Sequence, residues 1–188
     1  MSPLPPPDER PLRAVGARRT HTGSPTTPAI IRTLRDLAQE SPAIVAVFDA
    51  RAVAGERHLL SAWAHLGRAR SRGESRLRDR GAEFALYLAG DDQLPRALAK
   101  VGVSDSTEQF VLVAERPIDP VTLLERFELT VDPSAYPRPV GEELLDRLGV
   151  EAAERNAVPR SGWEGLVLER VALLDLSPPA ARTAPAKH

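Results

Sequence analysis

The sequence predicts an α+β fold, in which a small, mainly antiparallel sheet of about three strands is packed with six or seven helices. Two short apolar runs, residues 43–48 and 110–114, have the length and composition of buried strands. Roughly 60 residues with helical patterning separate them, so the order of elements does not follow a regular β-α-β alternation. At 188 residues, the chain has the length of one domain with a sizeable core.

The N-terminal part contributes one strand and one helix. Residues 1–10 are proline-rich and poor in large apolar groups, which predicts a disordered tail ahead of a single domain over residues 11–176. Residues 12–16 are compatible with a short edge strand. Thr27 and Pro28 are suited to cap and open a helix, whose apolar residues recur at helical spacing until Ser41-Pro42 ends it.

Residues 48–102 form the stretch around which the other elements are arranged. A turn over residues 49–55 leads into an amphipathic helix that carries Leu59, Trp63 and Leu66 on one side. Residues 83–90 are rich in Ala and Leu without β-branched residues, which predicts a short buried helix closed by Gly90. A further short helix is expected from residue 91 or 92 to 102, with Pro95 in its first turn.

The C-terminal part is predicted to be mostly helical. Residues 121–127 follow a capping Asp-Pro pair and are expected to form a helix, whereas residues 131–139 contain three prolines and are expected to form a loop. Short helices are predicted over residues 141–148 and 150–156, and a longer one over residues 163–174. Residues 177–188 are expected to be a flexible tail.

The composition is that of an ordinary globular protein, with 42% hydrophobic and 27% charged residues. No apolar run reaches 18 residues, so no membrane span is predicted. Four prolines fall within residues 1–10, which is unlike a secretory signal. The absence of cysteine excludes disulfides, thiol nucleophiles and thiolate metal sites. These features lead us to expect a cytoplasmic protein.

Positive charge is concentrated in one segment, although the whole chain has a net charge of −1. Residues 57–80 carry a local charge of +5, which is typical of a patch that binds a polyanion. The alternative is that the arginine stems cover apolar helix surface while their guanidinium groups stay solvated. The RNA interpretation places six arginines on one surface, the first three at helical i, i+4, i+8 spacing: Arg68, Arg72, Arg76, Arg78, Arg80 and Arg96. Aromatic residues make up only 4% of the chain, which favours recognition of an RNA end or shape over extensive base stacking.

Catalytic signatures are absent from the sequence. It contains no nucleotide-binding glycine motif, no H-E-x-x-H zinc motif and no G-x-S-x-G nucleophile motif. His58 and His65 are seven residues apart, so a metal site would need further ligands from elsewhere, and packed or surface histidines are the simpler expectation. Glu83 is either a buried carboxylate with a raised pKa or, more simply, support for the first turn of its helix. We therefore expect no catalytic residue, no cofactor and no metal.

Apolar residues on the later helices offer a second kind of binding surface. Leu94, Leu98, Trp163 and Val167 are candidates for a helix-mediated protein contact. The alternative is that they fill the core of the domain, which is the usual fate of apolar residues at helical spacing.

Several motifs, taken in order, resemble one family. They are FDARAVAG at residues 48–55, HL at 58–59, EFALYLAGxxQL at 83–94 and LVLERVALLD at 166–175. This order and spacing is similar to that of the PRPK-binding protein (TPRKB) family, the small accessory subunit of the KEOPS complex. The resemblance covers residues 43–176.

The resemblance implies a non-catalytic subunit of the complex that makes threonylcarbamoyladenosine in tRNA. Such a subunit binds the N-terminal lobe of a kinase-like ATPase of the PRPK family and holds the 3′ CCA end of tRNA, while another subunit performs the transfer. Asp91 and Asp92 occupy a turn where relatives usually carry basic or small polar residues, so we place the tRNA contact mainly on residues 68–80. The expected partner contacts are Leu94, Leu98 and Val167. The alternative is a protein-only adaptor that regulates a small kinase without touching RNA.

Overall fold

The computed structural model describes Pro6 and residues 9–20 and 25–176. Most of the two predicted tails, residues 1–10 and 177–188, therefore lies outside the described residues. The described part is an α+β domain with a four-stranded antiparallel sheet and seven α-helices, which confirms the predicted class. Within the described ranges, no helix has the length and apolar content needed to cross a bilayer.

The sheet has the strand order β2-β3-β1-β4, and every neighbouring pair is antiparallel. Its strands are β1 (Leu12–Arg19), β2 (Val45–Asp49), β3 (Gln109–Glu115) and β4 (Leu129–Val131). β3 lies inside the sheet, and its central residues are completely buried because both faces are covered.

The prediction of about three strands was one strand short, and β1 is longer than predicted. β4 has only three residues, which is too short to show alternation, and it exists because it pairs with the end of β1. That end contains Arg18 and Arg19, whose charge hid the strand in the sequence. Arg19 is accommodated because its guanidinium donates to the carbonyl oxygens of Thr107 and Pro25, each at 2.7 Å.

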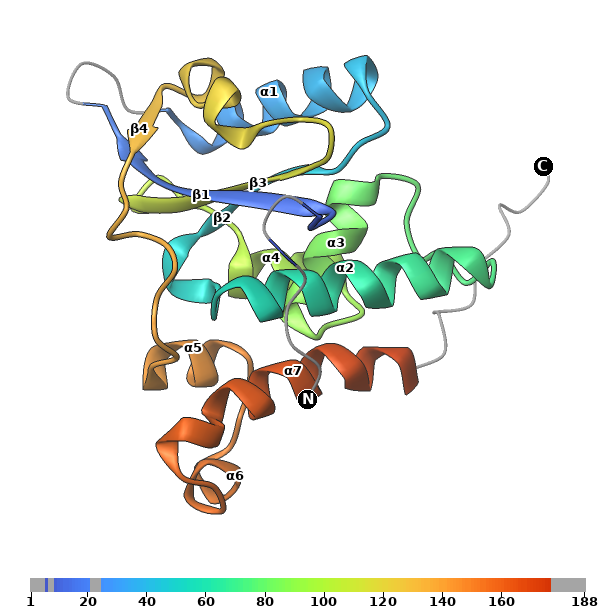
Figure 1. Ribbon diagram of the computed structural model, residues 1–188, viewed down its shortest axis with the longest axis vertical. Helices are drawn as coiled ribbons and strands as arrows, with labels where there is room; N and C mark the ends of the chain where they lie inside the picture. Colours follow the sequence, from blue (N-terminus) through green and yellow to red (C-terminus); the bar gives the residue numbers. More distant parts are fainter. Residues whose placement is uncertain (1–5, 7–8, 21–24, 177–188) are drawn as a thin grey trace, which may run out of the picture.

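One face of the sheet is covered by α1 (Thr27–Glu40) and by the segment that leads to β4 (Figure 1). α1 begins one residue earlier than predicted, since the hydroxyl of Thr26, not Thr27, accepts the capping bond from the Ala29 N–H. The predicted helix over residues 121–127 was wrong: the segment forms two 3₁₀ turns, Pro120–Leu123 and Glu125–Phe127. Glu128 follows with a φ of 53°, which ends the helical path.

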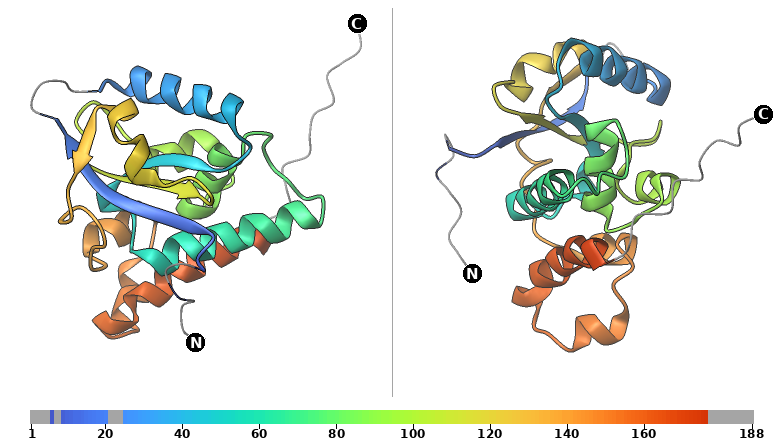
Figure 2. Two further views of the ribbon diagram at one scale, coloured as in Figure 1. Left: turned by 45° about the horizontal axis from the view of Figure 1, so that its top comes forward. Right: turned by 90° about the vertical axis from the view of Figure 1, so that its right-hand side faces the viewer.

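The other face is covered by a larger helical layer (Figures 1 and 2). Its members are α2 (Glu56–Ser71), α3 (Arg80–Ala89), α4 (Leu94–Val101), α5 (Glu142–Arg147), α6 (Ala152–Asn156) and α7 (Trp163–Leu173). α3 is the predicted buried helix, with residues 83–89 all buried, and it packs against α2, α4 and α7. It ends at Gly90 (φ 58°), where a Cβ atom would lie 2.7 Å from the Arg170 carbonyl oxygen.

His58 connects three parts of this layer from inside the core. Its Nδ1 accepts a hydrogen bond from the Ala54 N–H at 3.2 Å, so Nε2 carries the proton and donates to the Leu88 carbonyl oxygen at 2.8 Å. The side chain is completely buried. Burial lowers the pKa of His58 from 6.5 to about 4, although the bond to Leu88 opposes this shift. His58 is therefore a packed core histidine, which was the simpler of the two expectations from the sequence.

Candidate nucleic-acid interface

The basic segment lies at one end of the molecule, where α2 stops and the chain returns to α3 (right-hand side of Figure 1). We call residues 72–79 the arginine connection. α2 ends at Ser71 and does not continue through it, because Gly73 turns the chain with a φ of 75° and the Gly73 and Glu74 N–H groups bond back to the carbonyl oxygens of Arg70 and Ala69. The prediction that Arg68, Arg72 and Arg76 share one helix face was therefore wrong.

Glu83 holds the arginine connection in place from the first turns of α3. Its carboxylate is completely buried and accepts from the Arg70 Nε at 2.7 Å and from the Ser75 hydroxyl at 3.1 Å. The other carboxylate oxygen accepts from the Arg76 backbone N–H. Arg70 also donates to the carbonyl oxygen of Leu77 at 2.9 Å. This network fixes the path of a connection that has no regular secondary structure of its own.

Four of the six predicted RNA-binding arginines already have acceptors within the protein. Arg76 donates to the Leu174 carbonyl oxygen at 2.8 Å, and Arg80 binds Glu115 and the Pro42 carbonyl oxygen. Arg72 pairs with Glu74 at 2.7 Å, but both side chains are about half exposed, so this pair contributes little stability and a phosphate can replace it. Arg76 and Arg80 therefore have structural roles, but their guanidinium groups bind protein acceptors and do not stay solvated as the alternative interpretation expected.

Arg96 is the fourth, and it belongs to an acidic turn. Its guanidinium binds Asp91 and Asp92, each at 3.0 Å, while Lys100 binds the second oxygen of Asp91. Burial alone would raise the pKa of Asp91, but the Gln93 N–H and the two cations outweigh burial and lower the pKa. The turn before α4 is therefore compensated in charge and does not attract phosphate.

Arg68 and Arg78 are the two members of the predicted set that remain available. Arg68 lies in the last turn of α2, and Arg78 lies at the end of the arginine connection, just before the N-cap of α3. Both are exposed. Among residues 9–20 and 25–176, neither guanidinium has a hydrogen bond or an ion pair. Arg70 links the two segments that carry them, since its guanidinium donates to the Arg78 carbonyl oxygen at 3.2 Å. We take these two cations, together with the exposed Arg72, as the candidate site.

The predicted protein contacts separate clearly by exposure. Leu98 on α4 is 48% exposed, and Leu94 packs partly against the core. Val167 is completely buried inside α7 and cannot contact a partner in this conformation, so its assignment as a contact was wrong. Helical spacing alone could not separate these roles, because both core and surface leucines occur at such spacing.

Sequence reasoning missed two exposed apolar residues at the end of the helical segment: Leu173, the last residue of α7, is 42% exposed, and Leu176, in the 3₁₀ turn Leu174–Leu176 that follows, is 78% exposed. An open cleft of about 300 Å³ lies beside Leu173 and reaches Asp92 and Arg96 at the start of α4. The exposure of Leu173 could have been predicted from the sequence, because helical spacing places it on a different side of α7 from the buried residues Val167 and Val171.

The second histidine has a structural partner of its own. His65 Nδ1 lies 2.5 Å from an Asp175 carboxylate oxygen, and its ring stacks on Tyr87 with centroids 6.4 Å apart. This contact ties the end of the C-terminal helical segment to α2. In the part of the chain that the structure describes, no three side chains of His, Asp or Glu are grouped as metal ligands.

Comparison with known proteins gives no match to any family model or to any curated protein.

Proposed function

We propose that this protein is a non-catalytic subunit of a KEOPS-type tRNA-modifying complex, related to the PRPK-binding protein family. In this role it binds the kinase-like ATPase subunit and recruits tRNA through the 3′ CCA end, and it supplies no catalytic group. The observation that carries the proposal is a pair of exposed cations without a partner among the described residues: Arg68 in the last turn of α2 and Arg78 on the connection that buried Glu83 fixes in place.

A small cluster of this kind suits the end of an RNA chain. Guanidinium groups offer forked N–H donors that match two phosphate oxygens, and their flat faces stack on unpaired bases. Two or three phosphate contacts give weak, salt-sensitive binding. Such binding is useful for a subunit that raises the local concentration of tRNA at a distant active site.

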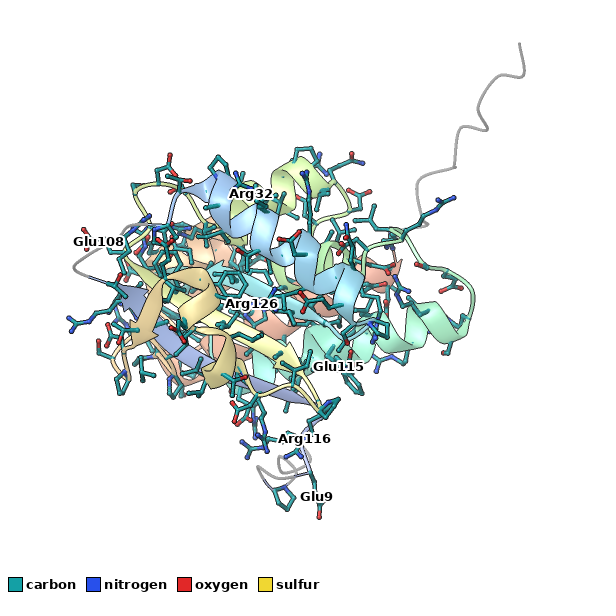
Figure 3. All side chains as sticks on the ribbon, turned by 90° about the horizontal axis from the view of Figure 1, so that it is seen from above. Glu9, Arg32, Glu108, Glu115, Arg116 and Arg126 are labelled. Carbon is teal, nitrogen blue, oxygen red and sulfur yellow. The ribbon has the colours of Figure 1, made fainter. Side chains whose placement is uncertain are left out.

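Charge reversal at the candidate site is expected to weaken tRNA binding by about tenfold or more, since both phosphate contacts become repulsive. The variant is Arg68→Glu combined with Arg78→Glu. Its matched control is Arg32→Glu combined with Arg35→Glu, because these arginines are also exposed but lie on α1, across the sheet (Figure 3 labels Arg32). Filter binding at two salt concentrations measures both. Equal loss in the two variants would show nonspecific attraction and contradict the proposal.

The exposed leucine of α4 supports the proposed contact with the kinase-like subunit. Replacing Leu98 by Asp is expected to weaken that complex about tenfold or more while leaving the fold intact, because the side chain is half exposed in the free protein. The matched control is Val121→Asp, which changes an equally exposed apolar residue on the other face of the sheet. Titration calorimetry with the ATPase subunit from the same genome measures both. Unchanged affinity for Leu98→Asp would remove α4 from the interface.

A protein-only adaptor is the alternative, and it is favoured by the ion pairs that already occupy Arg72, Arg80 and Arg96. An adaptor of that kind binds the ATPase subunit with unchanged affinity when Arg68 and Arg78 are reversed, and it shows no tRNA binding at low salt. The tRNA-binding measurement above therefore separates the alternatives, since both of them bind the ATPase subunit.

A further inference from the structure

The sheet has an open edge along the first half of β1. β4 pairs only with Ala17, Arg18 and Arg19, so Leu12 to Val15 extend beyond it. Among the described residues, this half of β1 pairs with β3 on one side and with no strand on the other. A bare strand edge presents unpaired backbone groups and is a template for another extended chain.

The direction of these backbone groups follows from two hydrogen bonds at the ends of the edge. The Pro11 carbonyl accepts from the Arg116 N–H, on the β3 side, whereas the Gly16 carbonyl accepts from the Asp132 N–H, on the open side. Because successive residues of a strand point to alternate sides, Leu12 and Ala14 direct both their N–H and C=O groups toward the open side. Among the described residues none of these four groups has a hydrogen bond, but Leu12 as a whole is only 4% exposed, so the N–H and C=O of the partly exposed Ala14 are the accessible pair.

An apolar pocket of about 250 Å³ lies next to this edge. Leu12 and Ala14 form its floor on the α2 side of the sheet, and Leu59 and Leu60 of α2 line it with Tyr136 and Pro137. Arg10 and Glu56, which are paired with each other, provide its polar end. The pocket can take an apolar side chain from a strand added to the edge.

The positive charge of Arg13 at this edge indicates which residue types an added strand should carry. Arg13 points to the opposite face from Leu12 and Ala14, and its only ion pair among the described residues is with Asp119, at 3.4 Å between half-exposed side chains. A residue facing Arg13 across the new strand pair is favoured if it is acidic. Its two neighbours then point toward the pocket side and are favoured if they are apolar.

We propose that the open edge of β1 binds an extended peptide segment of a partner protein by strand addition, with an apolar–acidic–apolar core. Main-chain bonds to Ala14 hold the segment, the pocket receives one apolar side chain, and Arg13 selects the acidic one. This surface lies apart from Arg68, Arg78 and Leu98, so the inference does not depend on the proposed tRNA and kinase contacts.

A second copy of this chain fits the edge poorly. If Leu12 of one copy paired with Ala14 of the other, each Arg13 would stand directly opposite its own counterpart, and like charges in that position are destabilising. The next register would require the Gly16 carbonyl, which Asp132 already occupies, and would run into β4.

The test uses random seven-residue peptides displayed on phage, selected on the full chain and counter-selected on an Ala14→Pro variant. The backbone N–H of residue 14 points to the open side of the sheet, so proline removes this donor without removing a bond to β3. Edge strands tolerate proline at such positions. Thermal unfolding confirms that the variant is folded. We expect enriched peptides with an apolar–acidic–apolar core that bind the wild type about tenfold more tightly than Ala14→Pro, as loss of one main-chain bond implies.

A second variant, Arg13→Glu, is expected to reverse the preference of the central position from acidic to basic while keeping its apolar neighbours. The proposal is overturned if no peptide distinguishes the wild type from Ala14→Pro, or if the central position is indifferent to Arg13→Glu. It is also overturned if sedimentation shows a wild-type dimer that Ala14→Pro dissociates, because the edge then binds a second copy.

Discussion

Replacing His58 by alanine is expected to lower the free energy of unfolding by about 3–5 kcal/mol. The substitution leaves the buried Ala54 N–H and Leu88 carbonyl without partners and opens a cavity at the junction of α2, α3 and the turn before α2. Urea denaturation measures the loss. His58→Gln is the matched control, since it can keep the donor to Leu88 and should lose clearly less. Equal stability of wild type and His58→Ala would show that the buried ring does not connect these elements.

The same residue gives the fold a defined acid sensitivity. Burial lowers the pKa of His58 to about 4 in the folded protein, whereas the unfolded chain has the ordinary value of 6.5. Between these pH values the unfolded state binds more protons, so stability falls as the pH drops from 6.5 toward 4. The difference amounts to roughly 3 kcal/mol at full protonation. His58→Gln should remove this part of the pH profile, and an unchanged slope would contradict the assignment.

Replacing Glu83 by alanine is expected to cost about 3–5 kcal/mol of stability, because breaking a buried ion pair from one side leaves an uncompensated charge. The change removes the acceptor of Arg70, Ser75 and the Arg76 backbone N–H together. The arginine connection should then open, so trypsin should cleave it faster, and tRNA binding should fall although no arginine has been changed.

The control for this variant is Glu74→Ala. Glu74 is an acid within the arginine connection, but its pair with Arg72 is exposed, so removing it should cost less than about 0.5 kcal/mol and leave the cleavage rate nearly unchanged. If Glu83→Ala and Glu74→Ala behave alike, Glu83 does not fix the arginine connection.

The core elements were predictable because their local patterns are strong. The buried α3, with its closing Gly90, and the apolar strand β3 follow directly from composition and length. β4 was missed, since three residues carry no periodic signal and the strand forms only when Ala17 to Arg19 are in place to pair with it. The 3₁₀ turns after Pro120 were mistaken for a helix, because capping residues look the same for both.

The candidate site was predictable only as a concentration of charge. Which arginines are free depends on partners distant in sequence, such as Glu115 for Arg80, 35 residues away, and Leu174 for Arg76, 98 residues away. No local pattern reports such pairs. For the same reason, spacing placed Val167 among the surface contacts, although the packing of α7 on α2 and α3 buries it.

The central proposal is that this protein holds the end of a tRNA and a neighbouring subunit while the chemistry takes place elsewhere. Its most direct test compares the affinity of the full chain for intact tRNA and for the same tRNA trimmed of its CCA nucleotides. We expect trimming to weaken binding about tenfold or more and Arg68→Glu with Arg78→Glu to abolish the difference. Equal affinity for intact and trimmed tRNA would contradict the account.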